Sequence, residues 1–409
     1  MDPLVKEYLK THSFQNLEDE HGVCARPNAK GDKFSLNYDQ ILVKNGDPIA
    51  EQCRGMVIRT KLFNASTYGE VWKQHQVGDV DVIAWPMNRF YNHGQDCSAD
   101  VDWSDPGLRV YEKLDGTMIV MYWDADDKRW HAATRSVPEA DLPVRKDHMQ
   151  IGDTTFSGLF WTALEKTYDA NVGDVYDFES WFDAHFDKSH TYIFELTTPF
   201  NRVVVKYDTM KATLLASRHT SSGVEKSIEH IDIPHIDRPL SWSLREPNQL
   251  VSFINSADPA KLEGAVVVDS KFNRLKIKNK AWVLSSKAKD LVTCSRRSAI
   301  LAIIENKIDD VMPLVEPDIR AELESMQVGV REYFKSIDRN FTEFKAGAAS
   351  DRKSFAFQVM TSGDWTAPYF KLWEGKAPTA LQWAQQQAED KKLSDSSLDV
   401  ILGKLNLQK

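Results

Sequence analysis

Hydrophobic residues recur along the chain with two different spacings, and the spacing changes near residue 285. Upstream of that point, short runs of β-branched and aromatic residues predict strands: two strands around a glycine turn within 108–123, and further strands within 191–217. Residues 263–283 are expected to form a hairpin. Apolar positions at helical spacing predict helices within 156–187.

Downstream of residue 285, the apolar positions follow a helical period, and strand-like runs are almost absent. Residues 299–304 begin one such pattern, and residues 323–344 carry a longer one. We therefore predict an α+β fold class, with a mixed domain over residues 1–285 and an all-helical C-terminal domain over residues 286–409.

The composition is that of a globular protein, with 42% hydrophobic and 27% charged residues among 409. No run of about 18 apolar residues is present, so we expect no membrane span. The N-terminus lacks the apolar segment of a secretory signal. Four scattered cysteines without a CxxC pair predict reduced thiols and a cytoplasmic location: Cys24, Cys53, Cys97 and Cys294.

Charge is segregated along the chain, although the formal net charge is −9. Residues 169–187 carry six acidic side chains and no lysine or arginine, whereas residues 261–297 carry ten cationic side chains against three acidic ones. Nucleic-acid binding depends on local charge. The acidic total therefore does not exclude a nucleic-acid partner, which residues 261–297 would contact.

Lys113 stands in the run Glu112-Lys113-Leu114-Asp115-Gly116, between two predicted strands. A glycine turn lets a ligand approach the backbone closely, and an unprotonated lysine amine is a nucleophile. Taken alone, the run is equally compatible with a solvated lysine before a turn.

Lys276 and Lys278 are two residues apart in a predicted strand, so both side chains should lie on one face. Like charges this close repel each other unless an anion lies between them. Glu263 opens the preceding apolar run and could hold a divalent cation through water. A solvent-facing strand and a surface acid are the simpler alternatives.

Glu195 lies within the apolar run Tyr192–Leu196, where an acid is costly unless it is paired or bound to a ligand. A ribose hydroxyl could donate to it, and a buried partner such as Arg202 is the alternative. Together, the nucleophile, cations and acids match the needs of a nucleoside triphosphate. No GxxxxGK[ST] run is present, which excludes a P-loop enzyme.

Four motifs follow one another along the chain: KLDG (113–116), FE (194–195), EGAVV (263–267) and KIK (276–278). Their residues and order resemble those of the covalent nucleotidyltransferases, a superfamily of DNA ligases, RNA ligases and mRNA capping enzymes. The chain is most similar to the bacteriophage RNA ligase 1 family of ATP-dependent tRNA-repair ligases. Stretches on both sides extend the resemblance over nearly the whole chain: 53–56, 85–92, 197–204 and 351–356. The resemblance implies an antiparallel-sheet ligase adenylation domain, unrelated to the ATP-grasp fold.

The resemblance also implies roles for individual residues. Lys113 would carry the adenylate, Glu263 would support Mg²⁺ and its waters, and Lys276 and Lys278 would stabilise charge at the α-phosphate. Nucleotide-binding positions are implied for Arg54, Arg89, Glu112, Asp115, Gly116, Glu195 and Tyr207. Of these, Glu195 would contact the ribose and Tyr207 would pack on the adenine. Arg89 replaces a lysine usual in the family, which retains the charge but excludes a proton transfer.

The implied activity is ATP-dependent joining of RNA 5′-phosphate and 3′-hydroxyl ends through a lysyl-AMP and an adenylated RNA 5′ end. The expected partner is RNA with single-stranded ends, such as a broken tRNA anticodon loop, and the expected enzyme is a monomer in the cytoplasm of a host cell. A capping-type guanylyltransferase and a non-catalytic RNA-binding module are the alternatives. The helical domain would either select structured RNA or only buttress the first domain.

Overall fold

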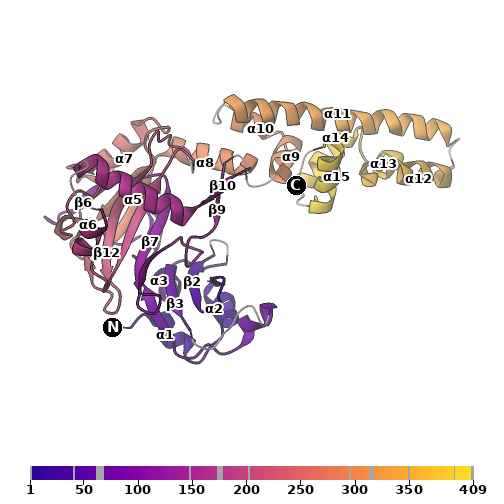
Figure 1. Cartoon of the computed structure of the whole chain (residues 1–409). Coiled ribbons are helices and arrows are strands. Elements are labelled where there is room, and N and C mark those ends of the chain that lie inside the picture. Colours follow the sequence, from indigo (N-terminus) through magenta and orange to yellow (C-terminus); the bar gives the residue numbers. More distant parts are fainter. Residues whose placement is uncertain are drawn as a thin grey trace. The chain divides into compact units, whose positions relative to one another are not determined.

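The structure, a computed structural model, describes residues 2–39, 42–60, 69–146, 149–172, 178–200, 203–293, 296–312, 317–348, 351–390 and 392–406. The chain divides into two compact units, Met1–Trp282 and Val283–Lys409. Within the described residues, the first unit holds all the strands and the second holds helices alone, which confirms the α+β class (Figure 1). The division falls inside helix α8 (Lys280–Thr293), as does the boundary predicted at residue 285.

Near the N-terminus, four antiparallel strands form a sheet that we call the N-terminal sheet, in the order β1-β2-β3-β4. Its strands are β1 (Val23–Pro27), β2 (Lys33–Tyr38), β3 (Arg54–Arg59) and β4 (Asp81–Ala84). The accompanying helices are α1 (Leu4–Leu9), α2 (Phe14–His21), α3 (Pro48–Gln52) and the 3-10 helix η1 (Gly69–Gln74). Leu9, Phe14 and Phe34 belong to the apolar core between these helices and the sheet.

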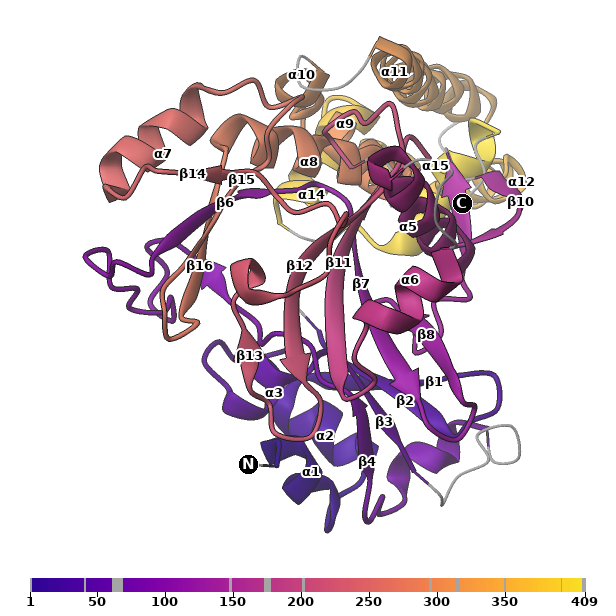
Figure 2. The ribbon, with the colours of Figure 1, turned by 60° about the vertical axis from the view of Figure 1, so that its left-hand side comes forward.

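The first unit also contains two five-stranded sheets and the two-stranded sheet β10-β9. The lysine sheet has the order β14-β6-β15-β16-β5, and the glutamate sheet has the order β13-β12-β11-β7-β8. The lysine sheet consists of β5 (Tyr91–Asn92), β6 (Arg109–Lys113), β14 (Ser241–Trp242), β15 (Gly264–Val268) and β16 (Arg274–Lys278). The glutamate sheet consists of β7 (Thr117–Asp124), β8 (Arg129–Ala133), β11 (His190–Thr197), β12 (Lys211–His219) and β13 (Glu225–Lys226). The turn from β6 to β7 therefore carries the chain from one sheet to the other (Figure 2).

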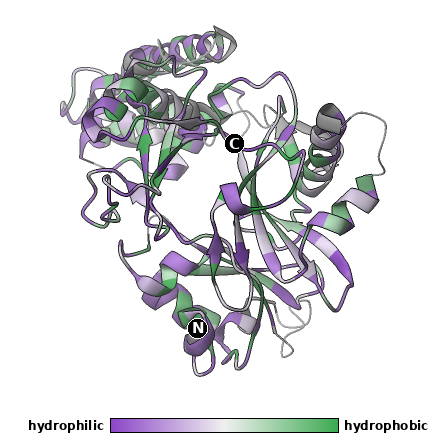
Figure 3. Ribbon diagram, turned by 90° about the vertical axis from the view of Figure 1, so that its left-hand side faces the viewer, coloured by the Kyte–Doolittle hydropathy of each residue, from purple (hydrophilic) through white to green (hydrophobic). Residues whose placement is uncertain are grey.

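Helices cover these sheets with apolar faces. Helices α5 (Phe156–Val172) and α6 (Phe178–His185) share a core with the glutamate sheet, and both lie within the predicted helical range. Helix α7 (Pro247–Ser256) packs on the lysine sheet. The remaining elements of this unit are β9 (Pro143–Lys146), β10 (Met149–Thr155) and η2 (Ile228–His230). Figure 3 shows hydrophobic and hydrophilic residues interspersed along the strands.

The second unit is built on helix α11 (Pro317–Gly347), whose predicted apolar positions Leu323, Val330, Phe334 and Ile337 are buried. Its other helices are α9 (Arg296–Ile304), α10 (Ile308–Val311), α12 (Arg352–Thr361), α13 (Thr366–Trp373), α14 (Ala380–Glu389) and α15 (Asp395–Lys404). Among the residues placed by the structure, no helix has the length and apolarity to cross a membrane.

The hairpin predicted over 263–283 is correct for β15 and β16 but wrong at its end. Strand β16 stops at Lys278, and α8 begins at Lys280. The buried side chain of Asn279 causes this change, because its Oδ1 accepts from the Ala281 and Trp282 N–H groups at 2.9 and 3.3 Å. Of the cysteines in the described chain, Cys24, Cys53 and Cys97 are free, whereas Cys294 lies outside the described residues.

Candidate functional site

A cavity of about 550 Å³ lies in the first unit, and strands of the N-terminal, lysine and glutamate sheets contribute to its wall. We call it the main cavity. Nine of the residues singled out from the sequence line it: Arg54, Glu112, Lys113, Asp115, Gly116, Glu195, Glu263, Lys276 and Lys278. Segments separated by more than 200 positions in the sequence, such as those of Arg54 and Glu263, thus meet around one space.

The turn between β6 and β7 positions Lys113 at the end of the lysine sheet. Gly116 closes the turn where no other residue fits, because a Cβ atom there would lie 2.3 Å from the Leu196 carbonyl oxygen. Its N–H donates to Glu195 Oε1 at 3.0 Å. The glycine therefore brings the end of β6 against strand β11 and links the turn to the carboxylate of Glu195.

Asp115 is a structural anchor of this turn. Its side chain is 3% exposed, and Oδ2 accepts from the Val204 and Val205 N–H groups at 2.8 and 2.7 Å. The same oxygen accepts from Trp282 Nε1 at 3.0 Å. These donors occupy Asp115, so it holds the turn and the neighbouring loop in position.

Glu263 links the two motif lysines nearest to it. Its Oε2 lies 2.8 Å from Lys113 Nζ, and its Oε1 lies 2.9 Å from Lys278 Nζ. Strand register explains the arrangement, because Gly264 of β15 pairs with Lys113 of β6 on one side and with Lys278 of β16 on the other. Glu263 is only 3% exposed, so the surface-acid alternative is wrong.

Lys276 shares the cavity face of β16 with Lys278, while Leu275 and Ile277 are buried on the other face. Burial, together with the charges of Arg54, Lys113 and Lys278, lowers the pKa of Lys276 to about 7. The amine lies 5.4 Å from the centre of the Phe90 ring. Lys276 therefore changes its charge near neutral pH.

Glu195 comes from strand β11 of the glutamate sheet. Burial raises its pKa to about 7, Lys113 opposes this shift, and Glu263 adds to it. The buried partner considered as an alternative, Arg202, lies outside the described residues. Glu112 also lines the cavity, and burial raises the pKa of its carboxyl.

Arg54 begins strand β3 of the N-terminal sheet. Its guanidinium lies over the Phe90 ring at 4.8 Å, and its buried Nη1 has no hydrogen-bond partner. Burial lowers the pKa of the group. A buried N–H without an acceptor is unfavourable, so this donor is suited to an anionic ligand.

Two predicted nucleotide-binding residues do not line the main cavity. The Tyr207 hydroxyl accepts from the Asp115 N–H at 3.0 Å. Arg89 lies over the Tyr38 and Tyr91 rings at 4.3 and 4.7 Å, and it lines a separate cavity. Tyr207 thus contacts the backbone of the turn after β6, and Arg89 contacts two aromatic rings.

The sequence analysis missed several residues of the cavity wall. Arg274 was detectable, because it continues the alternation of Lys276 and Lys278 along β16. Tyr38 and Arg135 carry no comparable signal, because they come from separate segments outside the motifs. Trp282 was expected in a strand, but it lies in the first turn of helix α8 and lines the cavity.

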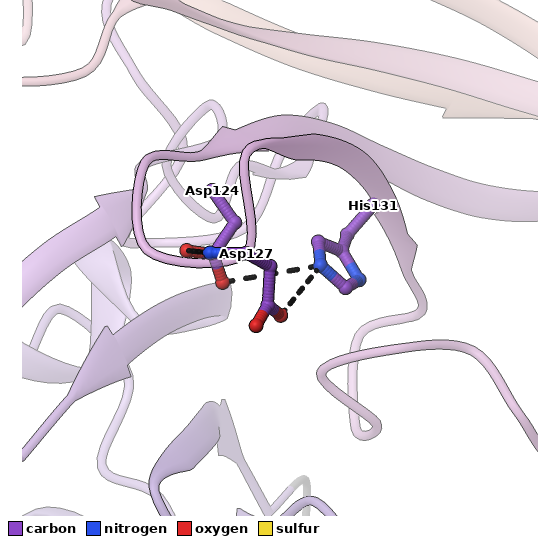
Figure 4. A group of neighbouring side chains, drawn as sticks. All are labelled: Asp124, Asp127 and His131. Carbon is purple, nitrogen blue, oxygen red and sulfur yellow. Dashed lines mark hydrogen bonds and ion pairs between the residues drawn. The ribbon is translucent and has the colours of Figure 1, made fainter.

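Asp124, Asp127 and His131 form a second cluster, with ligand-type atoms within 4.8 Å of one another (Figure 4). The fully buried Lys33 amine already lies among these side chains, 2.7 Å from Asp124 Oδ2 and 2.6 Å from Asp127 Oδ2. It also lies 2.9 Å from Glu139 Oε1. The ammonium group supplies the positive charge that a metal ion would bring, so the cluster is structural.

The chain is similar in sequence to two viral proteins that are named as ligases. It is 25% identical over 321 residues to a putative bifunctional polynucleotide kinase/RNA ligase of Autographa californica nuclear polyhedrosis virus, covering 76% of this chain and 41% of that protein. It is 22% identical over 366 residues to an RNA ligase of Rhodothermus phage RM378, covering 74% and 80%. The chain thus spans less than half of the first relative's length.

No family model matches the chain. Among solved structures, an archaeal ATP-dependent RNA ligase aligns over 92% of this chain and 94% of its own, with 12% identity and a TM-score of 0.37. The similarity to these two viral proteins confirms the resemblance drawn from the motifs.

Proposed function

We propose that the protein is an ATP-dependent RNA ligase. The observation that carries the proposal is the Lys113 amine, which borders one cavity together with two further lysines, a guanidinium with a buried unpaired nitrogen, and the carboxylates of Glu195 and Glu263. The relation to viral RNA ligases supports the substrate class. The proposal rests on this combination, because each motif alone has a simpler explanation.

In the first step, Lys113 Nζ attacks the α-phosphorus of ATP. A P–N bond forms, the bond from the α-phosphorus to the bridging oxygen breaks, and pyrophosphate leaves with that oxygen. The amine must lose a proton for this attack, and Glu263 Oε2, 2.8 Å from Nζ, can accept it. Negative charge increases on the phosphate oxygens, where Lys276, Lys278 and Arg54 would stabilise it.

In the second step, an oxygen of the RNA 5′-phosphate attacks the same phosphorus. The P–N bond breaks, a pyrophosphate link joins AMP to the RNA, and Lys113 regains its proton. In the third step, the RNA 3′-hydroxyl attacks the 5′-phosphate, loses its proton and displaces AMP. Each step is a displacement at phosphorus, so the work of the protein is positioning and charge neutralisation.

The acids of the cavity suit a divalent cation. Glu112, Glu195 and Glu263 line it, and Mg²⁺ prefers carboxylate and water oxygens. Both oxygens of Glu263 already accept from lysines, so Glu263 would hold Mg²⁺ through the waters of the ion. When bound, Mg²⁺ neutralises charge on the phosphate oxygens.

The test is covalent labelling of the purified protein with α-labelled ATP and Mg²⁺. We expect a labelled adduct with the unchanged protein and none with Lys113→Ala. Lys261→Ala is the matched control, because this exposed lysine does not line the main cavity. A labelled Lys113→Ala protein would contradict the assignment of the nucleophile.

The same experiment separates the alternatives. Labelling by GTP in place of ATP would favour a capping-type guanylyltransferase, and RNA binding without any adduct would favour a non-catalytic module. Joining of a 5′-phosphorylated oligoribonucleotide, with a nicked DNA duplex as control, tests the complete reaction.

We further propose, on the family resemblance, that the natural RNA is a broken tRNA and that the protein is a monomer acting in the cytoplasm of a host cell. Ligation of an anticodon-nicked tRNA against an unstructured oligoribonucleotide tests the first point. Light scattering of the purified protein tests the second, and fractionation of cells that express the chain tests the third.

A further inference from the structure

A second cavity of about 390 Å³ adjoins the main one. Phe90 and Arg274 line both cavities. The proposed mechanism gives no role to four further residues that line the second cavity: Arg89, Arg218, Lys271 and Phe272. Its volume is within the range of ligand pockets.

Two guanidinium groups of the second cavity carry buried N–H donors without acceptors. Arg218 is 11% exposed, and its Nη1 donates to Pro86 O and Asn88 Oδ1, yet its Nε has no partner. Arg89 donates from Nη2 to Asn45 Oδ1 at 3.0 Å, yet its Nη1 has no partner. Buried donors are normally satisfied, so these two point to an acceptor that the chain itself does not supply.

The charge of the second cavity favours an anion. Arg89, Arg218, Lys271 and Arg274 give it four cationic side chains, against the two carboxylates of Glu51 and Glu225. The buried carboxylate of Glu225 pairs with the guanidinium of Arg274 and lies 3.9 Å from Arg218 Nη2. An excess of cations remains, and guanidinium groups bind phosphate through paired N–H donors.

Phe272 adds an aromatic surface beside these cations. Its backbone has a φ of 63°, a conformation that bulky residues rarely adopt. The neighbouring turn holds it there, since the Phe272 N–H donates to the Asp269 carbonyl at 3.0 Å. Strained residues are concentrated at ligand-binding sites, and aromatic rings stack on the bases of single strands.

We propose that the second cavity binds one nucleotide of the single-stranded RNA end that the enzyme joins. The guanidinium groups of Arg89 and Arg218 contact its phosphate, and Phe272 contacts its base. The shared wall of Phe90 and Arg274 then places this nucleotide next to the cavity that holds the adenylated lysine. The identity of the polynucleotide as RNA rests on the proposed function.

The test measures binding of a 5′-phosphorylated oligoribonucleotide by fluorescence anisotropy without ATP, for Phe272→Gly, Lys271→Gln and Lys226→Gln. Glycine suits a positive φ, so Phe272→Gly removes the ring without destabilising the turn, which thermal melting checks. We expect Phe272→Gly to weaken binding about tenfold. Lys271→Gln should weaken it and reduce the slope of affinity against salt by about one unit.

Lys226→Gln is the matched control for charge, because Lys226 is exposed and lines neither cavity. It should bind RNA like the unchanged protein. Equal affinities for all three variants would overturn the proposal. A higher ATP requirement for adduct formation, with RNA affinity unaltered, would also overturn it, because the cavity would then hold a phosphate of ATP.

Transfer of AMP from the isolated adduct to the oligoribonucleotide gives a second measurement. We expect Phe272→Gly to slow transfer about tenfold more than it slows adduct formation from ATP. If the unchanged protein forms no adduct at all, the ligase proposal fails, whereas the anisotropy experiment still decides whether the second cavity binds RNA.

Discussion

At the scale of single residues, Lys276 and Lys278 differ although they occupy the same face of one strand. Lys278 has the carboxylate of Glu263 as a partner, whereas the structure describes no ion pair for Lys276. Burial among other cations leaves Lys276 with a pKa of about 7. Of the two lysines, Lys276 is therefore the one whose charge changes near neutral pH, and its attraction for a triphosphate changes with that charge.

We predict that ATP affinity falls as the pH rises from 6 to 8.5, because Lys276 is cationic below its pKa of about 7 and neutral above it. Lys276→Arg should weaken this dependence, because an arginine stays charged throughout, and the ionisation of Glu195 near pH 7 would account for what remains. Titration of both proteins with ATP at each pH measures the effect, and the protonation of ATP itself cancels in the comparison. Equal pH profiles would contradict the prediction.

Glu195 leads to a prediction about stability. Its pKa is raised from 4.5 to about 7, so the folded chain binds a proton more tightly than the unfolded chain, and stability is lost as the pH rises between these values. Glu195→Gln should therefore raise the melting temperature at pH 8 and have little effect at pH 5, while adduct formation falls. Calorimetry at both pH values measures this difference. A destabilised variant at pH 8 would show that the carboxylate is stabilising.

The site residues that can be found from the sequence are those that stand out from their immediate neighbours along the chain. The alternation of Lys276 and Lys278, and an acid in the apolar run of β11, can be seen without coordinates. The hydrogen bonds that occupy Asp115 come from Val204, Val205 and Trp282, which lie 89 to 167 positions away. They cannot be predicted from the residues next to Asp115 in the sequence.

At the scale of elements, two glycines let neighbouring strands approach each other closely, and these close approaches set the position of the motifs. Strand β6 can turn into β7 only because Gly116 leaves room for the Leu196 carbonyl. Gly264 plays the same part between β6 and β16, where a Cβ atom would lie 2.1 Å from the Ile277 carbonyl oxygen. These contacts explain why each glycine stands beside a charged motif residue.

We predict that Gly116→Ala lowers the free energy of unfolding by about 1–3 kcal/mol through overpacking and displaces Lys113. Gly158→Ala is the matched control, because a Cβ atom there meets only Thr155 Oγ1 at an ordinary 3.5 Å. Chemical denaturation and adduct formation measure both effects. Equal stability of the two variants would mean that the Leu196 carbonyl can move aside at little cost.

Elements with strong periodicity were predicted well, and their ends were not. The sequence after β16 continues with Ala281, Trp282 and Val283, which suit a strand as well as a helix. The buried cap at Asn279 decides in favour of the helix, and the burial of a polar residue cannot be inferred from its neighbours alone. Similarly, Phe355 belongs to the core of the second unit, although the cations Arg352 and Lys353 stand close to it in the sequence.

At the scale of the whole molecule, ion pairs join the N-terminal sheet to the glutamate sheet. Lys33 of β2 reaches Asp124 of β7, and Arg59 of β3 reaches the same carboxylate. The main cavity needs both sheets, because Arg54 comes from one and Glu195 from the other. The cluster around Lys33 therefore supports the site from a distance.

We predict that Lys33→Met lowers the free energy of unfolding by about 3–5 kcal/mol at pH 7, because it leaves buried carboxylates without their partner. Hydrogen bonding from Lys33 lowers the pKa of Asp127, so this stabilisation is present above the ordinary pKa of 3.8 and lost as the pH falls. The deficit of the variant should thus persist down to the ordinary pKa of 3.8 and shrink only below it. Lys30→Met, which removes an exposed lysine 3.7 Å from Asp127, should change stability little.

The division of the chain also separates the proposed chemistry from the helical unit. The residues that line the main cavity all lie at or before Trp282, which itself belongs to α8 and holds Asp115. A chain that ends at Thr293 keeps the whole of α8, so we predict that it still forms the adduct with ATP. If the helical unit selects structured RNA, the shortened chain should seal an unstructured oligoribonucleotide but lose at least tenfold in rate on a nicked tRNA. If that unit only buttresses the first one, the melting temperature and adduct formation should fall together, and the ratio of the two RNA rates should stay constant, because stability acts on both substrates alike.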